Sequence, residues 1–215
     1  MSRTQTVITR WWWVRHAPVI GAGGKIYGQR DLDADTSDTG RFTTLAAMVP
    51  RGALWLVSPL RRTHQTATAI RAAATDLALN PQPRIVPELI EQNFGAWQGL
   101  SHAEIDADNR PRTQRFWATP AMSRPPGGES FAELTQRLAP ALAEINHTEG
   151  GRDIIAVAHG GTIRAALSVA LALDPETALR FSIDTLSLTR LDHISVIGHP
   201  PVWRVVTVNH SSGRF

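Results

Sequence analysis

The chain alternates between short apolar runs and segments of mixed polarity. Thr6–Val14 is rich in β-branched and tryptophan residues, Ala53–Val57 is apolar, and Asp153–Ala158 contains the uninterrupted run Ile154-Ile155-Ala156-Val157. Continuous apolar runs of four to eight residues are typical of buried strands, and the last of these is typical of a central parallel strand. Further strands are predicted near residues 84–86, 186–191 and 202–208.

Helix signals lie between the predicted strands. Ser58-Pro59 supplies an N-cap and a proline for a first helical turn, and capping boxes begin at Ser101 (with Glu104) and Ser130 (with Glu133). Residues 109–128 carry several prolines and little periodicity, so this part is predicted to be irregular. Predicted helices cover 37–48, 58–74, 130–147 and 161–173, with others starting at Ser101 and at Asp174-Pro175.

Strands and helices in alternation predict an α/β fold. We expect a three-layer sandwich, with a mainly parallel central sheet, helices on both faces and an irregular lid-like insertion at about 101–128. The 215 residues suit a single domain, 1–215. In such sheets ligands bind beyond the carboxyl ends of the strands, so functional side chains are expected directly after strands.

Composition narrows the class of protein. The chain is 42% hydrophobic and 19% charged, which is typical of an ordinary globular protein. Its net charge is +3 and its positive residues are almost all arginine, but they are spread along the chain, which argues against a nucleic-acid-binding arm. Cysteine is absent, and no apolar run reaches the roughly 18 residues of a membrane helix. A cytoplasmic enzyme without membrane or nucleic-acid partners is therefore expected.

Two histidines and several arginines follow predicted strands. Arg15-His16 ends the first strand, Ser58–Arg62 follows the second, and His159 follows the run 153–158. A phosphoryl group in transfer spreads negative charge over its oxygens, so its reaction depends on positioning and on cationic groups such as arginine. A neutral imidazole can attack phosphorus, and a nearby carboxylic acid can protonate the leaving oxygen. The set predicts phosphoryl transfer.

Five motifs, in this order, resemble those of the histidine phosphatase superfamily, which also contains the cofactor-dependent phosphoglycerate mutases. They span about 150 residues: Val14-Arg15-His16-Ala17, Ser58–Thr66, Glu91–Gly99, Pro126–Ser130 and Ala158–Arg164.

The resemblance implies a role for each matching residue. His16 would be the nucleophile that becomes phosphorylated, and Arg15 and Arg62 would bind phosphate. Glu91 would be the proton donor and later activate water. His159 would donate a hydrogen bond to the transferring group. The N–H of Gly160, at a helix start, can also serve an anion.

Two stretches depart from the usual pattern. Ala17 and Pro18 stand where relatives carry glycine and often a polar residue, so the phosphate cradle is expected to differ slightly. The stretch Tyr27-Gly28-Gln29-Arg30-Asp31 resembles the loop after the nucleophile, where relatives contact phosphate or substrate. We assign Tyr27 and Gly28 to substrate binding, with an ordinary loop tyrosine as the alternative.

A phosphomonoester hydrolase acting on a small phosphorylated metabolite is the favoured function. The chain is shorter than the mutases it resembles and lacks their longer insertion, so hydrolysis is favoured over mutase-type phosphotransfer. A member that binds phosphorylated ligands without turnover is the other alternative. No metal site and no cofactor are predicted, because arginines supply the positive charge.

The sequence leaves the substrate open. α-Ribazole phosphate, sugar phosphates and small phosphorylated acids are candidates, the first being the preferred guess. A homodimer is also left open. One hypothesis is that the insertion forms a lid whose arginines select anionic or bulky substrates. The other is that its polar and aromatic side chains only cover the protein surface. The residues concerned are Arg110, Arg112, Arg115, Phe116, Trp117 and Arg124.

Overall fold

The computed structural model describes residues 6–74, 76 and 81–211. Within these residues six strands form one sheet in the order β3-β2-β4-β1-β5-β6. Strands β3, β2, β4 and β1 pair in parallel, while β5 and β6 add an antiparallel hairpin beside β1. The α/β fold with a mainly parallel sheet is confirmed. The strands are β1 (Thr6–Arg15), β2 (Leu54–Val57), β3 (Arg84–Ile85), β4 (Asp153–Ala158), β5 (Leu188–Val196) and β6 (Val202–His210).

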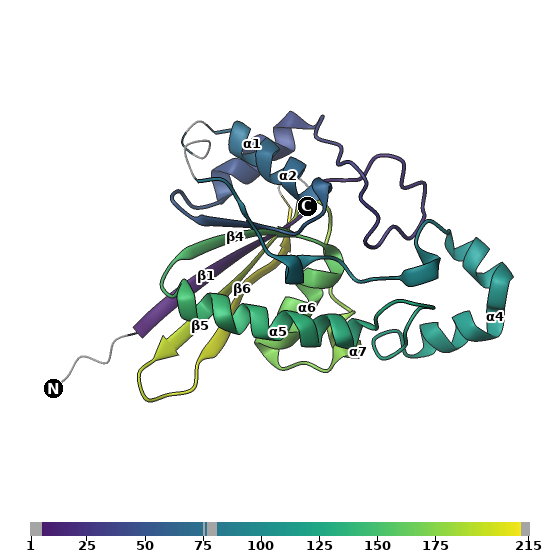
Figure 1. Cartoon of the computed structure of the whole chain (residues 1–215). Helices are drawn as coiled ribbons and strands as arrows, with labels where there is room; N and C mark the ends of the chain where they lie inside the picture. The colour runs from purple at the N-terminus through teal and green to yellow at the C-terminus, as the bar shows by residue number, and fades with distance from the viewer. Residues whose placement is uncertain (1–5, 75, 77–80, 212–215) are drawn as a thin grey trace.

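Helices cover both faces of the sheet (Figure 1). On one face lie α1 (Thr39–Met48) and α2 (Arg61–Ala72), whose Phe42 and Ile70 belong to one hydrophobic cluster. On the other face lie α5 (Phe131–Thr148), α6 (Gly160–Leu171) and the short α7 (Pro175–Ala178). No helix in the described part of the chain is long and apolar enough to span a bilayer.

The tryptophans of β1 anchor this central strand in both layers. Trp11 and Trp13 are fully buried on one face and stack with ring centroids 5.1 Å apart, because alternate strand residues share a face. Trp12 points to the other face, where its indole N–H donates to the carboxylate of Asp153 at 2.9 Å. The stacked tryptophans and the Trp12–Asp153 hydrogen bond hold β1 in place between the two helical layers.

Strands β1 and β4 are direct neighbours, with Arg15 opposite Ala158. The residues that follow, His16 and His159, therefore leave adjacent strand ends at the same edge of the sheet. The backbone N–H of His16 donates to the carbonyl of Ala158 at 3.0 Å, which ties the two exits together. This is the arrangement that the strand-end rule predicts.

The segment after β3 leads to a helix that protrudes beyond these strand ends. Two 3₁₀ turns, η1 (Pro87–Leu89) and η2 (Gly95–Trp97), flank Glu91. Helix α4 (His102–Ala118) then lies at the right of Figure 1, away from the layers that cover the sheet.

The prediction of irregular backbone from residue 109 is wrong for its first half. Helix α4 continues through Pro111 to Ala118, and only the stretch after it is irregular. Its packing explains the difference, because Ile105 and Phe116 are buried with Trp97 in a small hydrophobic cluster of their own. The capping box predicted at Ser101 is present, as is the one at Ser130.

Candidate active site

His16 is buried at the end of β1, with 1% of its surface exposed. Its Nδ1 lies 2.6 Å from the carbonyl oxygen of Ala17. A carbonyl can only accept, so Nδ1 carries the hydrogen and the lone pair of a neutral ring is on Nε2. The backbone contact therefore fixes the tautomer in which Nε2 can act as a nucleophile.

His159 follows β4 and is fully buried. Its ring centroid lies 5.1 Å from that of His16, at an interplanar angle of 61°. Nε2 lies 2.7 Å from the hydroxyl of Ser58, which itself follows β2, and Nδ1 accepts from Nε of Arg62 at 3.2 Å. Three parallel strands thus bring the two imidazoles and an arginine into one place.

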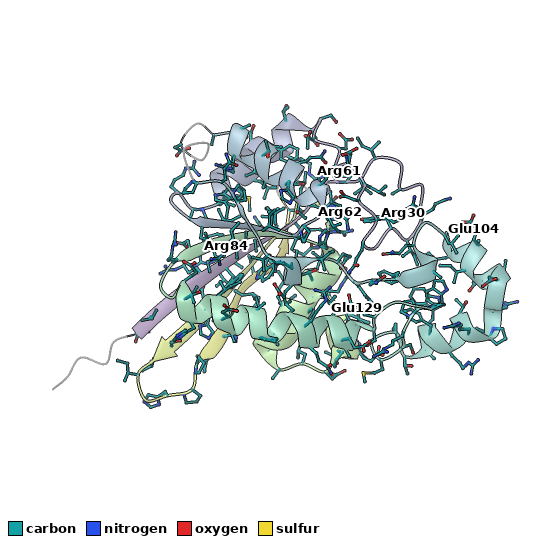
Figure 2. All side chains as sticks on the ribbon, viewed as in Figure 1. Arg30, Arg61, Arg62, Arg84, Glu104 and Glu129 are labelled. Carbon is teal, nitrogen blue, oxygen red and sulfur yellow. The ribbon has the colours of Figure 1, made fainter. Side chains whose placement is uncertain are left out.

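Arg62 is fully buried in the first turn of α2. Its terminal nitrogens donate to the carbonyl oxygens of Gly28 at 2.6 Å and Arg30 at 2.8 Å. Its guanidinium carbon also lies 5.1 Å from the ring centroid of Tyr27. In Figure 2 Arg62 and Arg30 lie toward α4, whereas Arg84, a residue of β3, lies farther from α4.

The loop of Tyr27 and Gly28 reaches the site. The Tyr27 ring lies 6.2 Å from the ring of His16 in an edge-on arrangement. Gly28 adopts a φ of +45°, and a Cβ there would lie 3.1 Å from the backbone carbonyl oxygen of Gln92, so a side chain would strain this loop. Gly28 holds Arg62 through its carbonyl, while Tyr27 forms part of the wall beside His16.

Glu91 comes to the same edge from the segment between η1 and η2. Its carboxylate accepts from the backbone N–H of Gln92 at 2.9 Å and of Gly161 at 3.2 Å. Gly161 lies in the first turn of α6, where backbone N–H groups lack helical partners. The carboxylate is therefore held at a helix N-terminus beside His159.

Arg15 and Gly160 complete the set expected from the sequence. Arg15 donates through Nη1 to the carbonyl of Ile183, while its Nε is buried without a hydrogen-bond partner in the described structure. Gly160 is the buried first residue of α6. A Cβ at Gly160 would lie 3.5 Å from Arg15 Nε, so this guanidinium passes directly over the helix start.

Both imidazoles are held neutral by their surroundings. Burial, followed by the charges of Arg62 and Arg15, lowers the pKa of His16 to about 3, against the opposing effect of the Ala17 carbonyl. Burial also lowers the pKa of His159 well below its usual value, with help from His16 and Arg62. A neutral imidazole beside guanidinium groups suits attack on an anionic phosphorus centre.

The residues at the unusual positions are built into the fold. The N–H of Ala17 donates to the hydroxyl of Thr66 at 2.9 Å, and the carbonyl of Pro18 accepts from Asp35 at 2.7 Å. Arg61, unlike Arg62, is exposed and pairs with Asp31 at 3.0 Å. The choice of Arg62 as the pocket arginine agrees with this placement.

Sequence reasoning missed three residues that position the site. Ser58 contacts His159, and Gln29 donates to the carbonyl oxygen of Glu91 at 2.8 Å. Arg137, on α5, donates to the carbonyls of Ile90 and Glu91 at 2.7 and 3.1 Å. Ser58 lies within a quoted motif, so its place after β2 could have signalled a role. Gln29 lies in the stretch 27–31 that resembles the loop after the nucleophile, so its position also carried a signal, whereas Arg137 carries none.

Comparisons with known proteins agree with this geometry. The histidine phosphatase superfamily (branch 1) matches residues 11–206. A glucosyl-3-phosphoglycerate phosphatase of Mycobacterium tuberculosis (strain H37Rv) is 38% identical over 171 residues, covering 74% of this chain and 73% of its own. A metal-independent phosphoserine phosphatase of Arabidopsis thaliana is 30% identical over 182 residues, which cover 81% of this chain and 74% of the relative.

Solved structures agree as well. A mycobacterial glucosyl-3-phosphoglycerate phosphatase in complex with VO3 has a TM-score of 0.78 and 28% identity, covering 94% of this chain and 99% of its own. These relatives are phosphatases, so the prediction of a phosphomonoester hydrolase is confirmed. The chain belongs to the histidine phosphatase superfamily.

Proposed function

We propose that this chain hydrolyses small phosphomonoesters through a phosphohistidine on His16. Nε2 of His16 attacks phosphorus in line, the bond from phosphorus to the ester oxygen breaks, and Glu91 gives its proton to the departing oxygen. Glu91 then removes a proton from water, which attacks phosphorus and returns Nε2 to its free state. Inorganic phosphate and an alcohol are the products.

The observation that carries this proposal is the tautomer of His16. Its Nδ1 is committed to the Ala17 carbonyl, and the low pKa keeps Nε2 unprotonated. Around it, Arg15 and Arg62 can donate to the phosphoryl oxygens, where charge is concentrated in the transition state. These donors are set in place by the fold before substrate binds, so little reorganisation is needed.

Hydrolysis is favoured over mutase-type transfer by the exposure of the insertion. A mutase must keep water from the phosphohistidine while its substrate reorients. Helix α4 presents a largely exposed surface, and its small buried cluster is separate from the two main clusters that pack on the sheet. Release to water is therefore the expected fate of the phosphoryl group.

A cytoplasmic location and a homodimer stay predictions.

The substrate is a small phosphorylated metabolite. Two relatives act, by name, on glucosyl-3-phosphoglycerate and phosphoserine, so the test panel should contain these compounds together with sugar phosphates. α-Ribazole phosphate belongs in the panel as well. The α-ribazole phosphatases among the solved structures share 20% identity and support the common fold only.

The test uses the purified full chain with p-nitrophenyl phosphate in the presence of a metal chelator. We expect turnover that falls by at least about 10³-fold in His16→Ala, because the nucleophile is lost. His64→Ala is the matched control, since His64 lies half-buried on α2 and takes no part in the site.

A second measurement identifies the intermediate. Substrate labelled in its phosphoryl group and quenched during turnover should leave label on wild-type protein and none on His16→Ala. Undiminished turnover in His16→Ala would refute the assignment of the nucleophile. Transfer of the label to an added phosphoglycerate, in place of release as phosphate, would support the mutase alternative.

A further inference from the structure

Arg164 brings a third guanidinium group to the edge of the site. It lies one turn along α6 from Gly160, and side chains on a helix lean toward its N-terminus. A Cβ at Gly160 would lie 3.4 Å from Nη1 of Arg164 and 3.5 Å from Nε of Arg15. Two guanidinium groups therefore meet above the same helix start, beside the carboxylate that Gly161 holds.

Neither of these arginines has a carboxylate partner in the part of the chain that the structure describes. Nε of Arg164 donates to the carbonyl of Phe181 at 2.7 Å, and Nη1 of Arg15 donates to that of Ile183. Burial lowers the pKa of Arg164, Glu91 opposes this effect and Arg15 adds to it. The hydrogen bonds of both guanidinium groups go to neutral carbonyls, and Glu91 is the one anionic group of the described residues that acts on Arg164, so the pair of cations is suited to a further anion from outside.

Counting charges indicates what kind of anion. The phosphate of a monoester carries about two negative charges near neutral pH, which the guanidinium groups of Arg15 and Arg62 match. Glu91 must be a neutral acid when it donates its proton, so it adds no charge at that step. The charge of Arg164 then remains uncompensated, and one further negative charge on the substrate would balance it.

The free side of Arg164 suits a carboxylate. Its Nε is used by Phe181, which leaves the terminal nitrogens for a ligand. A guanidinium group binds a planar carboxylate through two parallel hydrogen bonds, a geometry that a hydroxyl cannot reproduce. The half-buried position of Arg164 strengthens such a pair, since less water competes for it.

We propose that Arg164 binds a carboxylate of the substrate, so that the enzyme prefers phosphomonoesters of small hydroxy acids over equivalent phosphate esters without an acid group. This inference rests on the proposed function and names the substrate class for the same site. Arg164 acts here as a residue that touches substrate and determines specificity, while His16 and Glu91 carry out the bond changes.

Matched substrates test the proposal. 3-Phosphoglycerate carries a carboxylate where glycerol 3-phosphate carries a hydroxymethyl group. Phosphoserine carries a carboxylate where phosphoethanolamine carries a hydrogen. For the wild-type enzyme we expect kcat/KM to favour the acid of each pair by about 10- to 100-fold, the range that one hydrogen bond to a charged group supplies. Equal kcat/KM within both pairs would overturn the proposal.

Variants then assign the preference to Arg164. Arg164→Gln should lower kcat/KM for the two acids by that factor and change it for the two other esters by less than about threefold. Arg164→Lys keeps the charge and should keep part of the preference. Arg152→Gln is the control, because it removes one exposed arginine before β4, at the opposite end of that strand from His159.

A purely structural role predicts a different result. If Arg164 only holds the Phe181 carbonyl, Arg164→Gln will lower kcat/KM for all four esters by the same factor, and that outcome would overturn the carboxylate subsite. Calorimetric binding of 3-phosphoglycerate and glycerol 3-phosphate to His16→Ala is independent of turnover. A carboxylate preference in binding without any wild-type hydrolysis would refute the proposed function and leave the subsite standing.

Discussion

Replacing Gly161 by alanine tests whether Glu91 acts as the proton donor. A Cβ at Gly161 would lie 2.3 Å from Oε1 of Glu91, whereas ordinary contacts begin at 3.4 Å. The carboxylate must therefore retreat by about 1 Å, and Leu134, 3.3 Å from the same Cβ, limits movement of the helix instead. A displacement of about 1 Å at a reacting group can cost about 10²-fold in rate.

The assay compares two leaving groups. For an alkyl ester such as glycerol phosphate, Gly161→Ala should lower kcat/KM by about 100-fold, because the alkoxide needs the proton. For p-nitrophenyl phosphate the fall should stay below about tenfold, because nitrophenolate leaves readily without a proton. Reporting kcat/KM confines the comparison to steps up to the first bond cleavage.

The variant should remain folded, so that a loss of activity reports on Glu91. Gly161 is helical, and the preference of a helix for alanine over glycine, about 0.5–1 kcal/mol, offsets part of the cost of displacing Glu91 and crowding Leu134. Gly40→Ala in α1 is the control, since its Cβ would meet Asp38 at an ordinary 3.6 Å. An equal loss with both esters, or none with the alkyl ester, would refute the reasoning.

Three further predictions concern the histidines and the insertion. Between pH 6.5 and about 3 an unfolded histidine binds a proton that folded His16 does not, so this site lowers the free energy of unfolding by about 1.4 kcal/mol per pH unit as the pH falls. Urea titrations should therefore show that the free energy of unfolding falls between pH 7 and pH 5 by about 2 kcal/mol less in His16→Asn than in the wild type. Equal falls in both proteins would contradict the lowered pKa of His16. Ser58→Ala leaves Nε2 of His159 without its partner and should lower kcat by about tenfold, while Ser58→Thr, which keeps the hydroxyl, should recover most of it; a fall in Ser58→Thr as large as that in Ser58→Ala would argue against the hydroxyl. Alanine at Arg110, Arg112 and Arg115 should change the ratio of kcat/KM between bulky and small phosphomonoesters, and unchanged ratios would reject the lid hypothesis.

The strand ends could be predicted because they depend on local pattern. Apolar runs mark β1 and β4, and the residues after them, His16 and His159, must share an edge in a parallel sheet. Both capping boxes also formed as predicted, since a serine and a glutamate three residues later satisfy each other's backbone groups without help from the rest of the chain.

Other features depend on contacts between remote segments. Arg137 positions Glu91 across the gap between α5 and η1, and nothing in the sequence near either residue indicates this pairing. The sequence predicts too short a helix at α4, because Pro111 and weak periodicity argue against a helix, whereas burial of Ile105 and Phe116 favours one. Tertiary packing here outweighs local preference.

The adjacency of β1 and β4 has a consequence for how activity relates to assembly. A polypeptide divided between α5 and β4 would place His16 on one fragment and His159 on the other. The two imidazoles would meet again only if β4, on the second fragment, inserted into the middle of the sheet between β2 and β1 of the first. Enzymatic turnover by the mixed fragments would therefore show that the entire sheet has re-formed, without a fluorescent or isotopic label on either fragment.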